Sequence, residues 1–315
     1  MADEHAPHLA ARLAERPLGG VETAFALLAE AFTQRGHVVR QTQGGETAPA
    51  DLVIANRVPR LFARLPKRGR RVLWLHNPAG YLRKPRHAWP LLLARPWLVT
   101  LGPSHAATLP WWLPGRRVQI PLAVAPPFDA PTPPRAPPPP VAVFTSNPQR
   151  GLGWLLRLWA ERIAPAVPGA ELHLYASAAT YGDDPRLAAR IAPVLDQARA
   201  TPGVRLLAPL PRAALRDKLL AARCMLYRGD AGETFCLALA EAQAAGLPCV
   251  VTPLGAVAER LPDGVVAPDD DAFAAAAIRL LSDDAAWTAQ HHAALARGPG
   301  PGWHAVAAAF ERLAA

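Results

Sequence analysis

The chain has 315 residues, of which 51% are hydrophobic and 19% are charged, so it has enough apolar material for a full core and wholesale disorder is excluded. The 34 Lys and Arg residues outnumber the 25 Asp and Glu residues. The resulting net charge of +9 favours an anionic partner such as nucleic acid, a membrane surface or a phosphorylated small molecule.

The cysteines and the apolar runs exclude several classes of protein. Three cysteines occur without a C-x-x-C spacing, which supports neither a disulfide framework nor a zinc ribbon and indicates reduced thiols in the cytoplasm. No apolar run reaches the length of a membrane-spanning helix. Asp3 and Glu4 stand where a signal peptide would have a basic segment, so no signal peptide is expected.

The charge is concentrated in the first part of the chain. Residues 1–128 hold 17 Lys and Arg against 7 Asp and Glu, a net charge of +10, whereas residues 129–315 hold 17 against 18, a net charge of −1. The proline-dense stretch 129–140 at this switch is typical of a semi-rigid linker. We therefore expect an N-terminal domain over 1–128, a second domain over 141–302, and a C-terminal helix over 303–315 that packs back on the first domain.

The first domain alternates helical and strand-like segments. Apolar residues at helical spacing predict a helix over 22–36, which ends at a glycine. Short apolar runs predict buried strands at 51–56, 71–76 and 97–101. A clear first strand is missing, because 7–12 is a poor candidate; either that strand is weak or the domain is abbreviated.

The second domain repeats the alternation. A strand over 141–146 precedes a helix with one apolar face, formed by Leu152, Leu155, Leu156, Trp159 and Ile163. Further strands are expected at 171–177, 204–208, 224–227, 248–252 and 264–267. The pattern predicts an α/β protein with two facing Rossmann-like, doubly wound domains, the first abbreviated, and a ligand site at the carboxyl ends of the strands.

Two glutamates in segment 229–248 form the strongest chemical signal. Glu233 and Glu241 are separated by seven residues, and the first lies just ahead of an Ala- and Leu-rich helix, so they are at most on the order of 12 Å apart. This reach suits an elongated ligand, and the amides at the helix start offer an anion site. A nucleoside diphosphate sugar fits all three elements; the alternative is a capped surface helix that happens to carry two acids. The amides belong to Phe235, Cys236 and Leu237.

The surrounding sequence resembles the family-4 retaining glycosyltransferases of the GT-B fold. Segment 229–259 has the family's order of two spaced glutamates, a small-residue stretch, G-x-P and a strand. Segment 145–159 is similar to the family's strand, basic residue and helix, 16–23 to its Gly-rich first loop, and 72–77 to its strand ending in His. The resemblance implies transfer of a hexose-like sugar from a nucleotide sugar with retention of anomeric configuration, without metal or other cofactor.

The same resemblance implies a role for each matching residue. Arg150 stands where the family has a Lys that contacts the donor diphosphate, and His76 stands near the reacting sugar. Glu233 matches the residue that binds the donor-sugar hydroxyls, and Glu241 the one that binds the ribose. Cys236 departs from the family's usual Gly. The implied catalytic residues are Glu233, His76 and Arg150, and the implied donor-binding residues are Gly19, Gly20, Arg150, Glu233, Thr234, Phe235, Cys236, Leu237 and Glu241.

The acceptor is expected on the basic first domain. The runs 64–71 and 81–97 interleave Arg and Lys with tryptophans and leucines, and Trp111–Trp112 and Arg116–Arg117 add to them. This mixture suits peripheral contact with the inner face of a membrane and a lipid-linked or phosphorylated acceptor. The alternative places the tryptophans in the core and the arginines on a solvated face.

Other functions are weighed against glycosyl transfer. An epimerase on the same scaffold would need acid and base residues close together at the sugar, which the spacing of the two glutamates does not favour. A non-catalytic relative that binds a sugar nucleotide or a partner protein remains open, because of Cys236, the short first domain and a missing second basic residue near Ser146 and Asn147. Nucleic acid is not expected as a partner, since no helix-turn-helix, RRM or KH signature is present.

Overall fold

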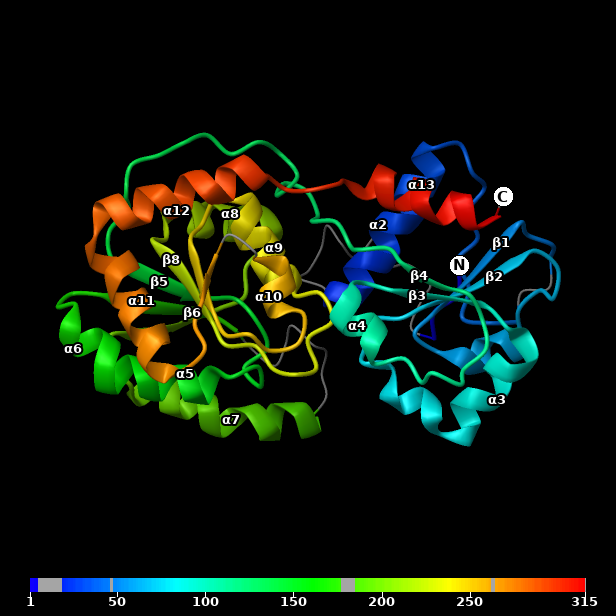
Figure 1. The fold of residues 1–315 in the computed structure, drawn as a ribbon, viewed down its shortest axis with the longest axis horizontal. Coiled ribbons are helices and arrows are strands. Elements are labelled where there is room, and N and C mark those ends of the chain that lie inside the picture. The colour runs from blue at the N-terminus through cyan, green and yellow to red at the C-terminus, as the bar shows by residue number, and fades with distance from the viewer. Residues whose placement is uncertain (5–18, 46–47, 177–184, 262–263, 315) are drawn as a thin grey trace.

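The computed structural model describes residues 1–4, 19–45, 48–176, 185–261 and 264–314. They form two α/β domains, each built on a parallel sheet. Figure 1 shows the two domains side by side along the long axis, with both termini on the first domain. The expected fold class is confirmed.

The first sheet has the strand order β1-β2-β3-β4, and all its pairs are parallel. The strands are β1 (Leu52–Asn56), β2 (Arg70–Trp74), β3 (Trp97–Thr100) and β4 (Arg117–Gln119). The helices are α2 (Gly20–Gln34), α3 (Pro85–Ala94) and α4 (Pro103–Ala107), with short helical turns η1 (Pro59–Ala63) and η2 (Ala79–Arg83). The three expected strands are present because parallel strands buried on both faces are continuous apolar runs.

The first residues of the chain supply the strand that the sequence pattern lacks. Ala2 is buried and bridges in parallel to Thr42 on one side and to Ala55 of β1 on the other. The first residues therefore lie beside β1, the edge strand of the four-stranded sheet, between β1 and the segment at Thr42. The candidate strand at 7–12 lies outside the described residues.

The second sheet has the order β10-β9-β8-β5-β6-β7 and is also parallel. Its strands are β5 (Val141–Phe144), β6 (Glu171–Tyr175), β7 (Val204–Leu207), β8 (Cys224–Tyr227), β9 (Cys249–Val251) and β10 (Val265–Val266). Since β5 is followed in sequence by strands on one side and then by strands on the other, the order reverses between β5 and β8. Ligands of open α/β sheets bind at such a reversal.

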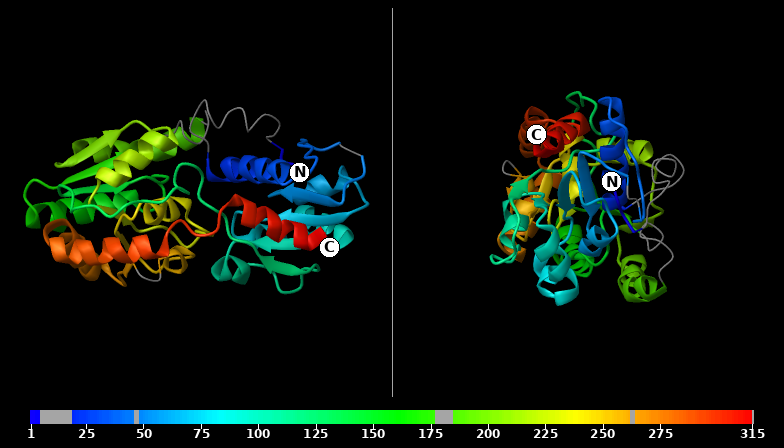
Figure 2. Two further views of the ribbon diagram at one scale, coloured as in Figure 1. Left: turned by 90° about the horizontal axis from the view of Figure 1, so that it is seen from above. Right: turned by 90° about the vertical axis from the view of Figure 1, so that its right-hand side faces the viewer.

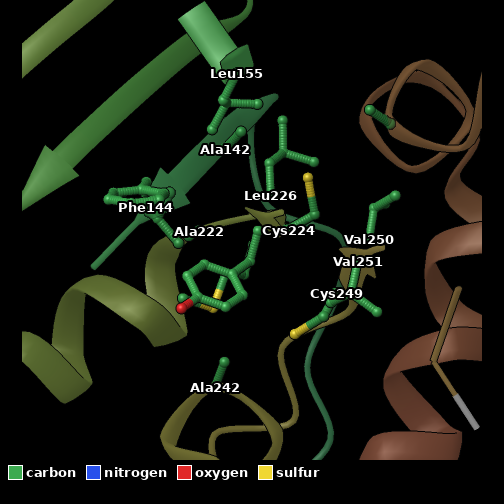
Figure 3. Close-up of a cluster of buried hydrophobic side chains, with 14 of the residues drawn as sticks. Ala142, Phe144, Leu155, Ala222, Cys224, Leu226, Ala242, Cys249, Val250 and Val251 are labelled. Carbon is green, nitrogen blue, oxygen red and sulfur yellow. The ribbon is translucent and has the colours of Figure 1, made fainter. Parts of the chain in front are cut away.

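Helices cover both faces of this sheet (Figure 2). They are α5 (Leu152–Leu158), η3 (Trp159–Ile163), α6 (Ala164–Ala166), α7 (Pro185–Ala200), α8 (Arg212–Ala221), α9 (Leu237–Ala244), α10 (Val257–Arg260), α11 (Asp270–Ser282) and α12 (Asp284–Arg297). The five residues expected on one face of the helix at 152–163 are all buried. Figure 3 shows the core between the sheet and its helices. Phe144, Leu226 and Val250 come from strands of the sheet, and Leu155 comes from α5. The free, buried cysteines belong to these packed layers.

The C-terminal helix α13 (Trp303–Ala314) lies on the first domain, although the chain reaches it from the second (Figure 1). Its apolar face packs with helix α2 and the first sheet, through Trp303, Val306, Ala307, Phe310 and Leu313. Glu311 adds a bidentate pair with Arg35, with both N–O distances 2.6 Å. The two domains are thus joined by two chain crossings.

The proline-rich stretch 129–140, which follows the first crossing, is held against the second domain. Val124 and Phe128 belong to the second domain's core, whereas Leu122 and Ala123 belong to the first domain's core, so the chain passes from one core to the other at residues 123–124. Arg135 lies over the ring of Trp287, 5.5 Å from its centroid, and donates to the carbonyl of Ala245 at 2.9 Å. The proline-rich stretch is therefore a strap held along the second domain.

Candidate functional site

The loop after β8 brings the first of the two glutamates to the carboxyl edge of the second sheet. Gly229 and Gly255 have positive φ angles of 71° and 55°, which glycine adopts without steric cost. A Cβ on Gly255 would lie 2.8 Å from the carbonyl oxygen of Glu233. Close packing of these two glycine loops thus fixes the backbone that carries Glu233.

The Glu233 side chain is held by three neighbours. Tyr227 donates a hydrogen bond to its Oε1, and Arg150 Nη1 lies 3.1 Å from the same oxygen. Arg150 also donates to Asp230 at 3.0 Å. The structure therefore brings together Arg150 and Glu233, which the sequence placed in one site although they are far apart along the chain.

Glu233 is shielded from water, with 8% of its surface exposed. Burial raises the pKa of its carboxyl, while Arg150 and the Tyr227 hydroxyl act in the opposite direction. Desolvation disfavours the charged form of an acid, and a nearby cation favours it. Glu233 is thus a carboxyl whose proton affinity depends on its partners, and such groups concentrate at functional sites.

The second glutamate has a partner that the sequence analysis did not identify. Arg212, at the start of α8, forms an ion pair with Glu241 on α9, and its Nη2 donates to the Thr23 hydroxyl on α2 at 3.3 Å. Glu241 and Thr23 are both buried. Arg212 therefore links the predicted ribose-binding residue to the first domain.

Helix α9 begins at the boundary between the domains. Its N-cap is Cys236, which has a φ angle of 63°, in the left-handed region that non-glycine residues adopt at a cost of roughly 1–2 kcal/mol. The glycine that the resemblance implies at this position would adopt such a φ angle without steric cost. A Cβ on Gly20 would lie 2.8 Å from Leu237 Cδ1. The N-termini of α2 and α9 therefore meet, and each presents amides that lack intrahelical partners.

His76 lies just beyond the end of β2, and its backbone contacts the second domain. Its carbonyl oxygen accepts a hydrogen bond of 2.6 Å from the Thr234 hydroxyl. Burial lowers the pKa of the imidazole well below its ordinary value, with further contributions from Arg57 and His105. Within the described residues, His76 Nε2 is buried and has no hydrogen-bond partner. A neutral ring with one unmatched nitrogen is suited to a polar ligand group.

Direct contacts close the boundary between the domains. The amide of Ser104, in the first turn of α4, donates to Glu259 Oε1 of the second domain at 2.6 Å. Phe235 packs into the first domain's core, and the Arg260 guanidinium lies 4.2 Å from its ring centroid. Two cavities, of about 480 and 520 Å³, lie in the first domain and are not lined by Glu233.

Two further polar side chains of the second domain have structural roles. Asp269 caps α11 by accepting from the amide of Ala272 at 2.8 Å, as its position before a helix predicts. His291 accepts from the amide of Arg135 at 3.2 Å and lies 2.5 Å from the carbonyl oxygen of Gly246. Both ring nitrogens are thus occupied.

Three solved structures share the arrangement of the two domains. Sucrose-phosphate synthase from Thermosynechococcus elongatus has a TM-score of 0.69 at 15% identity, and the match covers 94% of this chain and 92% of that one. AviGT4, a glycosyltransferase involved in avilamycin A biosynthesis, has a TM-score of 0.62 at 18% identity, covering 95% and 90%. The pneumococcal O-GlcNAc transferase GtfA, in complex with UDP and GlcNAc, has a TM-score of 0.61 at 14% identity, covering 93% and 60%. At these identities the likeness establishes the fold, which is of the GT-B class.

The family comparison is more specific for the second domain. Residues 139–283 match the family described as Glycosyl transferases group 1. The matched range contains Arg150, Arg212, Glu233 and Glu241. A comparison with curated protein sequences gave no match. The second domain is thus similar to the glycosyl transferases group 1 family over most of its length, and it lies within a GT-B fold.

Proposed function

We propose that this protein transfers a sugar from a nucleoside diphosphate sugar to an acceptor. The observation that carries the proposal is the buried Glu233, held by Arg150 and Tyr227 at the domain boundary. Such an environment suits a carboxylate that accepts hydrogen bonds from sugar hydroxyls. The domain matched by the glycosyl transferases group 1 family supports this activity.

The donor would span the two glutamates. Its diphosphate lies against Arg150 and the amides at residues 235–237, its sugar hydroxyls meet Glu233, and its ribose meets Glu241. Thr234 holds the backbone of His76 through a hydrogen bond, which keeps His76 beside the segment that would carry the donor. Gly19 is the N-cap of α2 and Gly20 is its first residue, and the absence of a Cβ at both positions permits close approach.

The transfer retains the anomeric configuration. The bond between the anomeric carbon and the diphosphate oxygen breaks, the acceptor oxygen bonds to the same face, and the leaving phosphate takes the acceptor proton. Because the Glu233 carboxyl is engaged by Arg150 and Tyr227, it binds and orients the sugar and does not attack it. The leaving charge is stabilised by donors already in place.

The reaction needs neither a metal ion nor another cofactor. A guanidinium binds phosphate oxygens in a bidentate manner, and helix N-termini favour anions. Arg150 and the first turn of α9 would together perform the neutralisation that a divalent cation provides elsewhere.

The acceptor is a lipid-linked or phosphorylated molecule that approaches from the first domain, and the enzyme works at the cytoplasmic face of a membrane. The support is the net charge of +10 on residues 1–128. Within the described residues, no helix is long and apolar enough to cross a bilayer.

The test is donor turnover in a chelator. Release of nucleoside diphosphate is measured with a panel of UDP-, GDP- and ADP-sugars in EDTA, and the product's anomeric configuration is assigned by NMR. We expect turnover with one nucleotide and a product that keeps the donor's configuration. An inverted product would contradict the same-face mechanism, and activity only with added metal would contradict cofactor independence.

A non-catalytic relative is the second candidate. It is favoured by one observation: Glu233 and Glu241 are both paired with arginines while the domains are in contact. Such a protein would bind a nucleotide sugar tightly and release no nucleoside diphosphate, with or without acceptor. The same turnover assay therefore separates the two candidates.

A further inference from the structure

One face of α3 is apolar and exposed to solvent. Trp89, Leu92 and Leu93 have 65%, 40% and 69% of their surface exposed. Their spacing of three and four residues places them on one side of the helix. The opposite side, with Leu91 and Ala94, is buried in the first domain. Exposed apolar side chains grouped on one side of a helix indicate a surface that contacts a partner.

The loop before β4 extends this apolar surface. Trp111 is 88% exposed and Trp112 is 40% exposed. The loop is held in place from below: Leu109 and Leu113 belong to the same buried cluster as the inner side of α3. Arg117 also donates to the carbonyl of Trp111 at 3.0 Å. The two tryptophans thus lie on an anchored loop that packs with the inner side of α3.

A basic cavity of about 520 Å³ adjoins the end of α3. Its lining includes one acid, Asp51, and four arginines: Arg70, Arg71, Arg95 and Arg116. Within the described residues, none of these four guanidiniums makes a recorded ion pair or hydrogen bond with a side chain. A group of unpaired guanidiniums around one hollow favours an anionic group such as a phosphate.

The cavity and the tryptophan loop are joined through the backbone. A Cβ on Gly115 would lie 2.2 Å from the carbonyl oxygen of Pro96, so the loop passes directly against the residues that follow α3. Leu98 donates from its amide to the carbonyl of Arg116 at 2.7 Å. The Arg116 guanidinium lies 5.3 Å from the ring centroid of Trp97. Exposed apolar side chains and unpaired guanidiniums are therefore neighbours.

We propose that this basic-aromatic face, made of the outer side of α3, the loop at 111–112 and the arginine-lined cavity, docks the first domain on an anionic lipid bilayer. Tryptophan is suited to the level of lipid headgroups, where its ring is apolar and its N–H meets water. Leu92 and Leu93 enter the acyl boundary, and the cavity receives a headgroup phosphate.

The position of this face is compatible with transfer. The arginines lie at the amino ends of β2 to β4, whereas His76 lies beyond the carboxyl end of β2. A strand of five residues spans about 15 Å. The docked protein would keep its domain boundary off the membrane plane but within reach of a headgroup-linked acceptor.

Vesicle binding tests the proposal without any donor, so its failure and that of glycosyl transfer are distinguishable. The full chain is sedimented with phosphatidylcholine vesicles with and without phosphatidylglycerol, at low and high salt. We expect binding only to the anionic vesicles, weakened by salt. Absence of binding to anionic vesicles, or equal binding to both kinds, would overturn the proposal.

Matched variants separate lipid docking from adhesion by charge. Each guanidinium at an anionic surface contributes about fivefold to binding, so Arg95→Gln/Arg116→Gln should bind more than tenfold more weakly. Trp89→Ser/Leu93→Ser should also bind more than tenfold more weakly with an unchanged melting temperature. The controls Val38→Ser and Arg157→Gln alter an exposed apolar and an exposed basic residue elsewhere and should bind as the wild type does. If the apolar double variant binds normally and soluble polyphosphate displaces the vesicles, the face is a polyanion site and the proposal is wrong.

Discussion

The arginines of the two domains are used in different ways. At the boundary face of the second domain, Arg150 and Arg212 each pair with a buried glutamate. On the far side of the first domain, Arg70, Arg95 and Arg116 surround an open cavity with no recorded side-chain partner within the described residues. The net charge of each part of the chain, −1 and +10, reflects this difference.

The paired arginines suit recognition of one ligand, whereas the unpaired arginines suit attraction to a charged surface. A guanidinium paired with a buried carboxylate is fixed in position and can exchange that carboxylate for a substrate group. Removing the guanidinium by mutation leaves the carboxylate as an uncompensated buried charge. An unpaired guanidinium keeps its full charge for a distant polyanion, and its effect is screened by salt. Net charge alone would have assigned all of these arginines to one partner.

The largest effect is expected at Glu233. In Glu233→Gln, the charge that orders Arg150 and the sugar hydroxyls is lost, and turnover should fall about a hundredfold or more, equivalent to about 3 kcal/mol of transition-state stabilisation. Steady-state release of nucleoside diphosphate measures it. The control is Glu161→Gln, at an exposed position. Turnover within twofold of the wild type would remove Glu233 from the site.

A smaller effect is expected when Arg212 is replaced. Arg212→Met leaves the Glu241 carboxylate buried without its cation, and an unmatched buried group costs about 1–3 kcal/mol. Urea unfolding measures the loss. Removing the carboxylate as well, in Arg212→Met/Glu241→Gln, should restore most of the stability. If the double variant is as unstable as the sum of the single variants, the pair is not coupled.

The C-terminal helix offers a test that depends on pH. The pKa of Glu311 is lowered to about 2, first by its hydrogen bond from Arg35 and then by His37. A carboxyl with a lowered pKa stabilises the fold above its unfolded pKa of about 4.3, and this stability is lost as the pH falls toward 2. Glu311→Gln should cost at most about 1 kcal/mol at pH 7, because the pair is partly exposed to solvent.

Urea unfolding over this pH range measures the difference in unfolding free energy between the wild type and Glu311→Gln. It should shrink below pH 4.3. A difference that stays constant with pH would show that the pair contributes nothing through its charge.

The smallest effect is expected when Arg95 is replaced by glycine. This change should stabilise the fold but weaken docking on the membrane. Arg95 ends α3 with a φ angle of 43°, where glycine is favoured. Arg95→Gly should stabilise the fold by about 0.5 kcal/mol after the greater flexibility of the unfolded chain is counted. The same change should weaken binding to anionic vesicles. A variant that is less stable, or that binds as tightly as the wild type, would break the contrast between the two faces.

Most strands of the fold were predictable, whereas β4 and some other elements were not. Buried parallel strands such as β8 and β9 are short apolar runs that stand out in the sequence. Helix α3 was not expected, because Pro90 lies inside it and proline normally interrupts a helix. The first strand was missed because its pairing is limited to a bridge at Ala2.

The candidate site was predictable only where residues are close in sequence or match a family pattern. Glu233, Glu241 and the start of α9 are of this kind. Arg212 was missed because its contacts with Glu241 and Thr23 depend on tertiary packing. The tryptophans of the basic runs divide between the two interpretations: Trp97 is partly buried against the core, whereas Trp89 and Trp111 are exposed.

Binding of nucleoside diphosphates tests the central claim most directly. Calorimetry in EDTA compares the wild type with Arg150→Gln and with Arg95→Gln/Arg116→Gln. We predict that one nucleoside diphosphate binds the wild type, binds Arg150→Gln at least tenfold more weakly, and binds the double variant unchanged. Equal binding to the wild type and Arg150→Gln, or a loss confined to the double variant, would contradict the assignment of the donor site to the second domain.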